Sequence, residues 1–129
     1  MKIGCPKEIK PQEFRVGMTP STAGEAVRHG HEVVVQASGG AGAGFTDDDY
    51  RAVGASIADT AEEIFASADM IVKVKEPQAG ERAMLREGQV LFTYLHLAPD
   101  PDQTRDLIAS GATCIAYETV TDERGGLPL

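Results

Sequence analysis

The sequence has little of several residue types, and each shortage narrows what the protein can do. Its 129 residues include no tryptophan and only two cysteines. Cys5 and Cys114 lie far apart, without a CxxC pattern or a histidine at zinc-ligand spacing. We therefore expect free, buried thiols rather than a disulfide framework or a zinc site.

Basic residues are also scarce. Lys and Arg number 12 against 20 Asp and Glu, which gives a formal net charge of −8. Such a surface repels phosphate backbones and anionic membranes, so we expect neither nucleic acid nor a membrane as a partner. A small anionic substrate can still bind, because a few cations in one cleft outweigh the global field over short distances.

Long apolar runs are missing too. Runs such as Val33–Val35 and Val90–Phe92 are far too short to cross a bilayer, and Pro6 interrupts the start of the chain before an apolar stretch of signal-peptide length. We therefore expect a cytoplasmic protein. The chain length and its 42% hydrophobic positions are enough for one compact domain with a core.

Short β-branched runs alternate with segments that carry helix start and stop signals, which is typical of repeated βα units in a parallel sheet. Most of the runs are continuously apolar, as expected when helices cover both faces of the sheet. We predict a doubly wound α/β domain of the Rossmann-like or flavodoxin-like type, with a mainly parallel sheet. The predicted strands are Lys2–Cys5, Glu32–Gln36, Ala55–Ile57, Met70–Lys75, Val90–Leu95 and Thr113–Tyr117.

The segments between the strands contain clear helix signals. Thr19 with Pro20 can begin a helix that Gly30 ends, because proline fits the first helical position. Further signals are Thr46 before Asp47–Val53, a capping box of Thr60 with Glu63, a weak helix over Glu81–Arg86, and Asp100 with Gln103 in a helix closed by Gly111.

Four polar side chains follow strands of this predicted sheet. They are Arg15, Lys75, His96 and Glu118. Open parallel sheets bind ligands beyond the carboxyl ends of their strands, so the βα pattern places all four on the ligand-binding edge.

Lys75 lies in Lys73-Val74-Lys75-Glu76-Pro77. Pro77 disfavours helical geometry at Glu76, so the strand should end in an extended loop that presents Lys75 as a point charge for a carboxylate or carbonyl oxygen. The alternative is a solvated lysine paired with Glu76.

His96 sits in apolar sequence at a strand end, and it is the histidine best placed for catalysis. His29 and His31 flank Gly30 in a turn, where we expect exposure. An imidazole can accept and return a proton near neutral pH, as general acid/base chemistry requires. The alternative is a structural histidine.

Arg15 can hold a carboxylate through two parallel hydrogen bonds, or it can simply form a surface ion pair with Glu13. Glu118 can orient Lys75 or Arg15, or it can be solvated. The glycine-rich segment Ser38–Gly44 follows a strand, but its spacing does not fit GxGxxG. We therefore favour a flexible surface or subunit-contact loop over a dinucleotide site.

Five motifs, in order and in spacing, resemble the N-terminal region of alanine dehydrogenases. They are Ile3-Gly4 to Pro6, Glu13-Phe14-Arg15-Val16 with Thr19-Pro20, Lys73 to Pro77, Leu95-His96-Leu97-Ala98, and Tyr117-Glu118-Thr119-Val120. The resemblance covers the whole chain. The related N-terminal domain of nicotinamide nucleotide transhydrogenases is similar through the arginine loop but typically lacks counterparts of Lys75 and His96.

The resemblance implies an oxidoreductase of amino-acid catabolism, which converts L-alanine, water and NAD reversibly into pyruvate, ammonium and NADH. By the same resemblance, Arg15 and Lys75 bind the substrate carboxylate and carbonyl, and His96 is the acid/base. Hydride transfer belongs to the nicotinamide. The resemblance also suggests hexamers, so we expect a homo-oligomer.

The chain departs from this family in length. The chain stops within the apolar Leu127-Pro128-Leu129, where a finished domain usually has a polar tail. The resemblance implies that residues 1–129 are the first segment of the substrate-binding domain, without the NAD-binding Rossmann domain, the returning C-terminal segment and the family's catalytic aspartate. We expect no turnover by this chain alone. The alternatives are a non-catalytic, truncated module that folds and binds small carboxylates or oligomerises, and the N-terminal domain of a nicotinamide nucleotide transhydrogenase.

Overall fold

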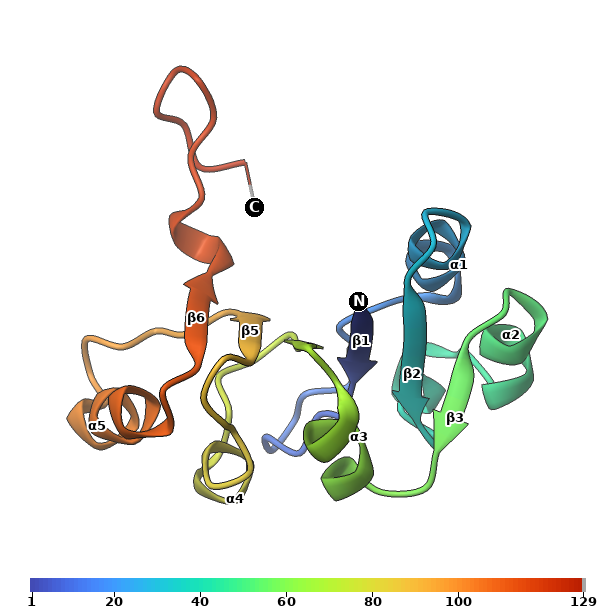
Figure 1. The fold of residues 1–129 in the computed structure, drawn as a ribbon. Helices are drawn as coiled ribbons and strands as arrows, with labels where there is room; N and C mark the ends of the chain where they lie inside the picture. Colours follow the sequence, from blue (N-terminus) through green and yellow to red (C-terminus); the bar gives the residue numbers. More distant parts are fainter. Residues whose placement is uncertain (129) are drawn as a thin grey trace.

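The computed structural model describes residues 1–128. Six strands within this range form one sheet. The strands are β1 (Lys2–Cys5), β2 (Glu32–Gln36), β3 (Ser56–Ala58), β4 (Met70–Val72), β5 (Val90–Thr93) and β6 (Thr113–Ala116). All neighbours pair in parallel, in the order β3-β2-β1-β4-β5-β6 (Figure 1). The strand order reverses at β1: β2 and β3 lie on one side of it, and β4, β5 and β6 lie on the other. Ligands are expected at this switch point, beyond the carboxyl ends of β1 and β4.

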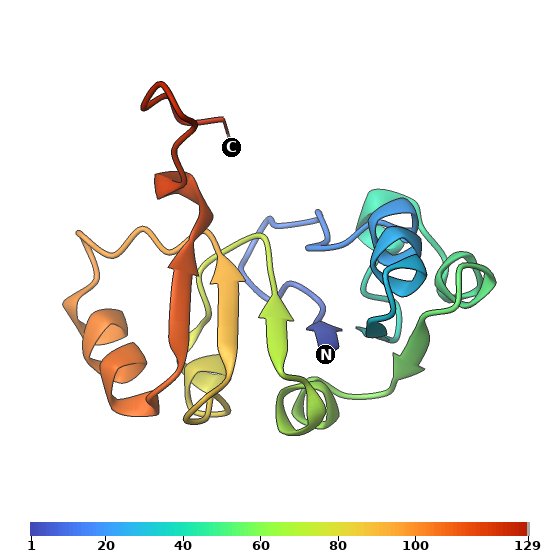
Figure 2. The same ribbon diagram turned by 45° about the horizontal axis from the view of Figure 1, so that its top comes forward.

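Helices cover both faces of the sheet (Figure 2). One face carries α1 (Pro20–Arg28) and α2 (Asp47–Ala52), and the other carries α3 (Ala61–Ser67), α4 (Ala79–Arg82) and α5 (Pro101–Ser110). Residues of β2 divide between the two cores: Val33 and Val35 pack with α1 and α2, and Val34 packs with α3. This alternation explains why the strand is continuously apolar, and it confirms the predicted doubly wound α/β fold.

Gly4 allows α3 to pack closely on β1. A Cβ atom at this position would lie 2.4 Å from Ile64 Cγ2 and 2.8 Å from Ala68 Cβ, both on or next to α3. A side chain there would therefore push the helix away from the sheet.

The strand predicted over Thr113–Tyr117 ends one residue early, at Ala116, and two other strands end two or three residues early, each for an identifiable reason. The prediction of Met70–Lys75 is too long because the backbone N–H of Val74 donates to the Glu8 carboxylate at 2.7 Å instead of continuing the ladder. The prediction of Val90–Leu95 is too long because the amide of Leu95 donates to Glu118. Carboxylates from distant segments thus end both strands where the candidate site begins.

The helix signals are mostly confirmed. Thr19, Thr46, Thr60 and Asp100 are all N-cap residues whose side chains accept a backbone N–H. The predicted helix over Glu81–Arg86 is displaced, because α4 begins at Ala79, where Glu81 accepts the amide of Gln78 at 2.8 Å. None of the helices within residues 1–128 has the length and apolar character that crossing a membrane requires.

After β6 the chain forms the short 3-10 helix η2 (Tyr117–Thr119) and then extends away from the sheet and its helices (Figure 1). The segment from 120 to 128 is exposed throughout. Its one internal turn is closed by Asp122, which accepts the amides of Arg124 and Gly126.

Candidate functional site

The predicted site residues lie at the carboxyl edge of the sheet, on the segments that follow β1, β4, β5 and β6. Interactions between neighbouring side chains join them in sequence. Glu13 forms an ion pair with Arg15, and the positive charge of Lys75 helps to lower the pKa of Glu13. The Lys75 ammonium lies over the ring of Tyr94, and the Tyr94 hydroxyl contacts His96. The edge therefore combines two cations with an imidazole, as the sequence predicts.

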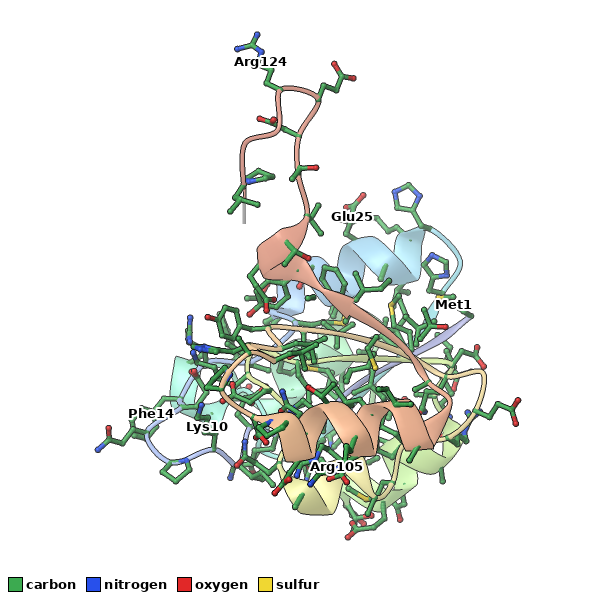
Figure 3. All side chains as sticks on the ribbon, turned by 90° about the vertical axis from the view of Figure 1, so that its left-hand side faces the viewer. Met1, Lys10, Phe14, Glu25, Arg105 and Arg124 are labelled. Atoms are coloured by element: carbon green, nitrogen blue, oxygen red, sulfur yellow. The ribbon has the colours of Figure 1, made fainter. Side chains whose placement is uncertain are left out.

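Arg15 is exposed on the loop between β1 and α1, which carries Phe14 and Lys10 on the outer side of the domain (Figure 3). Its Nε and Nη2 atoms donate to the two carboxylate oxygens of Glu13 at 2.9 and 2.6 Å. This bidentate contact is the main reason that the pKa of Glu13 falls to about 2. The ion pair fixes the guanidinium but leaves its remaining N–H groups for a ligand.

Lys75 does not pair with Glu76, which instead pairs with Lys10. The Lys75 ammonium lies 4.7 Å from the centroid of the Tyr94 ring, in a cation–π contact. Within residues 1–128 no carboxylate forms an ion pair with this ammonium, so its charge is available to an anionic ligand.

His96 is exposed and adopts a φ of +47°, a left-handed conformation that costs free energy for a residue with a Cβ. Its backbone is held firmly in compensation. The amides of Leu95 and His96 both donate to Glu118, at 3.0 and 2.9 Å, and Gln103 donates its side-chain amide to the Leu95 carbonyl at 2.6 Å. These contacts fix the direction in which the imidazole leaves the chain.

Glu118 therefore has a different position from the one we predicted. It neither orients Lys75 or Arg15 nor lies free in solvent, because both oxygens face backbone amides beyond β5. The sequence could not reveal this contact, which joins η2 to the segment after β5.

The other histidines and the cysteines lie elsewhere. His29 is exposed as predicted and pairs with Glu25, whereas His31 is half-buried, contrary to expectation. Cys5 and Cys114 are free, and burial raises the pKa of the Cys5 thiol to about 11. Cys114 is only half-buried, so the prediction of buried thiols holds fully for Cys5.

The glycine-rich segment supports the arginine loop. A Cβ atom at Gly42 would lie 2.7 Å from the Phe14 carbonyl oxygen, so the missing side chain lets the two loops pack together. The amides of Ala41, Ala43 and Gly44 already donate to carbonyls within the segment, and that of Gly39 donates to the Gln36 carbonyl just before it. Because these donors are engaged, the segment does not fit the pyrophosphate of a dinucleotide.

A buried charge cluster, which no local sequence pattern indicates, lies directly behind the site. The Lys73 ammonium is 3.1 Å from a Glu8 oxygen and 2.7 Å from a Glu81 oxygen, and all three side chains are at most 3% exposed. Glu8 also accepts the amide of Val74, so the cluster connects the start of the arginine loop with the residue before Lys75.

A parallel α/β domain with two cations and an imidazole at its carboxyl edge is suited to hold and protonate a small carboxylate ligand. The profile of the family described as "Alanine dehydrogenase/PNT, N-terminal domain" matches residues 4–129. The chain belongs to this family.

Known proteins of this family are similar along the whole chain. The alanine dehydrogenase of Halomonas elongata is 57% identical over 129 residues, which are 100% of this chain and 35% of that enzyme. A solved L-alanine dehydrogenase structure superposes with a TM-score of 0.96 at 48% identity, covering 99% of this chain and 35% of the other.

The transhydrogenase of Sinorhizobium meliloti is less similar, with a TM-score of 0.88 and 28% identity over 96% of this chain and 37% of that structure. The chain thus spans about a third of the length of its relatives.

Proposed function

We propose that this chain is the substrate-binding portion of an L-alanine dehydrogenase, which interconverts L-alanine with pyruvate and ammonium using NAD. The single observation that carries the proposal is the grouping of Arg15, Lys75 and His96 at one edge of the sheet, linked through Glu13 and Tyr94. The similarity to alanine dehydrogenases along the whole chain supports the same assignment.

The proposed roles follow from the chemistry of each side chain. The guanidinium of Arg15 binds the substrate carboxylate, since Glu13 holds it in place without using all its donors. The ammonium of Lys75 binds an oxygen of the carboxylate or carbonyl. The imidazole of His96 gives a proton to the substrate oxygen in one direction and removes it in the other.

NAD would supply hydride chemistry, but the glycine-rich segment does not fit it. We propose that NAD binds a Rossmann domain in the remainder of a longer protein, and that residues 1–129 are the first segment of its substrate-binding domain. The length of the relatives supports this arrangement. We further propose a cytoplasmic homo-oligomer, of the hexameric kind that the family resemblance suggests.

The test is a calorimetric titration of the chain with pyruvate and, separately, with NADH. We expect saturable binding of pyruvate and none of NADH. Arg15→Ala should weaken pyruvate binding about ten- to a hundredfold, because a hydrogen bond to a charged group contributes about 1.5–3 kcal/mol.

Arg105→Ala is the matched control. Arg105 is equally exposed, at 71% against 66% for Arg15, and likewise pairs with one nearby carboxylate, but it lies on α5. The Arg105→Ala variant should bind pyruvate as tightly as wild type. Equal losses in both variants would show that binding follows net charge alone and would contradict the proposal.

A further inference from the structure

Tyr94 lies between the two halves of the candidate site. The face of its ring carries the Lys75 ammonium at 4.7 Å, and its hydroxyl lies 3.0 Å from Nδ1 of His96. The rings of Tyr94 and His96 also meet edge-on, with centroids 5.5 Å apart. One side chain therefore contacts both the cation and the imidazole.

The surroundings of Tyr94 fix its position. Its ring lies 6.2 Å from that of Tyr117, measured between centroids, and Tyr117 in turn packs on Phe92 at 5.6 Å. The Tyr117 hydroxyl donates to the Val74 carbonyl at 2.5 Å, next to Lys75. The aromatic cluster thus joins β5 to η2, and through the Tyr117 hydroxyl it is tied to the segment after β4, which restricts movement of Tyr94.

The hydroxyl of Tyr94 suits Nδ1 in either protonation state of the imidazole. When the proton is exchanged at Nε2, Nδ1 keeps its hydrogen in both the imidazolium and the neutral imidazole, and the phenol oxygen accepts from Nδ1–H in each state. The ring orientation is therefore the same before and after proton transfer. Because Nδ1 is occupied in this way, Nε2 is the nitrogen left for a ligand.

We infer that Tyr94 is a positioning residue that holds Lys75 with its ring and His96 with its hydroxyl, so that Nε2 of His96 exchanges the proton with the substrate. In that exchange the Nε2–H bond breaks, the electron pair stays on the ring nitrogen, and an O–H bond forms on the substrate oxygen. The inference deepens the proposed function and rests on it for the identity of the substrate.

Two variants separate the two contacts. Tyr94→Phe removes only the hydroxyl, whereas Tyr94→Leu removes the ring as well. In NMR spectra of the ¹⁵N- and ¹³C-labelled chain at alkaline pH, Tyr94→Phe should shift the Nδ1 signal of His96 and leave those of His29 and His31 in place. The ε-methylene protons of Lys75 should keep their ring-current shift in Tyr94→Phe and lose it in Tyr94→Leu.

Tyr117→Phe is the matched control, because it removes a hydroxyl from the same aromatic cluster without touching His96 or Lys75 directly. It should leave the His96 Nδ1 signal unmoved. If Tyr94→Leu fails to fold, Lys75→Met replaces it, and the signals of the Tyr94 ring should shift when the ammonium is removed. Signals of His96 that coincide in wild type and Tyr94→Phe would overturn the inference.

Pyruvate titration separates failure of the inference from failure of the proposed function. Tyr94→Phe should bind pyruvate within twofold of wild type in this assay, and Tyr94→Leu about two- to fivefold more weakly, since a partly exposed cation–π contact contributes about 0.5–1 kcal/mol. If pyruvate fails to bind while the spectral shifts occur, the proposed substrate is wrong and the positioning role of Tyr94 stands. Unchanged spectra with normal pyruvate binding would overturn only the role of Tyr94.

Discussion

Lys73 and Lys75 lie two residues apart, yet their surroundings are opposite. The ammonium of Lys73 is enclosed by the carboxylates of Glu8 and Glu81 and is 1% exposed. That of Lys75 is half-buried over an aromatic ring and forms no ion pair within residues 1–128. One lysine therefore holds segments of the chain together through ion pairs, and the charge of the other is not paired with a carboxylate of the described residues.

The contrast shows how a buried charge cluster can place a charged side chain at the edge of the sheet. Burying Lys73 alone would be costly, and each carboxylate repays part of the cost only while the partner is present. Glu8 in turn fixes the amide of Val74. The buried cluster thus holds the backbone from which Lys75 projects, so that the lysine needs no ion pair of its own to be placed.

The largest effect should come from removing the buried lysine. Lys73→Met leaves two buried carboxylates without their cation, and breaking such a contact costs about 3–5 kcal/mol. We expect this loss in the free energy of unfolding, measured by urea denaturation. Adding Glu8→Gln and Glu81→Gln to the same variant should recover part of it, because the unpaired charges are then gone. A Lys73→Met protein as stable as wild type would remove the distinction between the two lysines.

Lys75→Met should show the reverse behaviour. Its free energy of unfolding should change by less than about 1 kcal/mol, because only a partly exposed cation–π contact is lost. Its affinity for pyruvate should fall about ten- to a hundredfold, as expected when a charged hydrogen bond is lost. Denaturation and calorimetry on the same preparation make the comparison. Pyruvate affinity that survives this change would contradict the ligand-binding role of Lys75.

Much of the arrangement could be predicted from sequence because it depends on local patterns. Apolar runs located the strands, and the βα alternation placed Arg15, Lys75 and His96 on one edge. The contacts that refine the site join residues far apart in the chain, such as Glu8 with Lys73 and Glu118 with the amide of His96. No local pattern signals these pairs, because either carboxylate could equally be solvated.

Tyr94 is an intermediate case. It precedes His96 by two residues, and side chains at that spacing lie on the same side of an extended segment. The spacing could have indicated a tyrosine beside the histidine. The contact of the ring with Lys75, on a neighbouring strand segment, required the folded structure.

The smallest effect concerns the ion pair of Glu13 with Arg15, whose guanidinium side is exposed, in contrast with the buried pairs of Lys73. The pKa of Glu13 falls from its ordinary value of 4.5 to about 2, mainly because Arg15 hydrogen-bonds its carboxylate. A lowered carboxyl pKa stabilises the folded state above the unfolded value, and this contribution is lost as the pH falls through the folded value.

We therefore expect Glu13→Gln to reduce stability slightly at pH 7 and to match wild type near pH 2. Urea denaturation across pH 2 to 7 gives the difference between the two proteins, in which other titrating carboxylates cancel. Since Arg15 is 66% exposed, solvent screens the pair and the difference should be small and shrink further with added salt. Glu123→Gln, in the exposed segment after η2, is the control for loss of one exposed carboxylate and should leave the free energy of unfolding at pH 7 unchanged. A constant difference across the whole pH range would mean that Glu13 acts through packing rather than through its charge on Arg15.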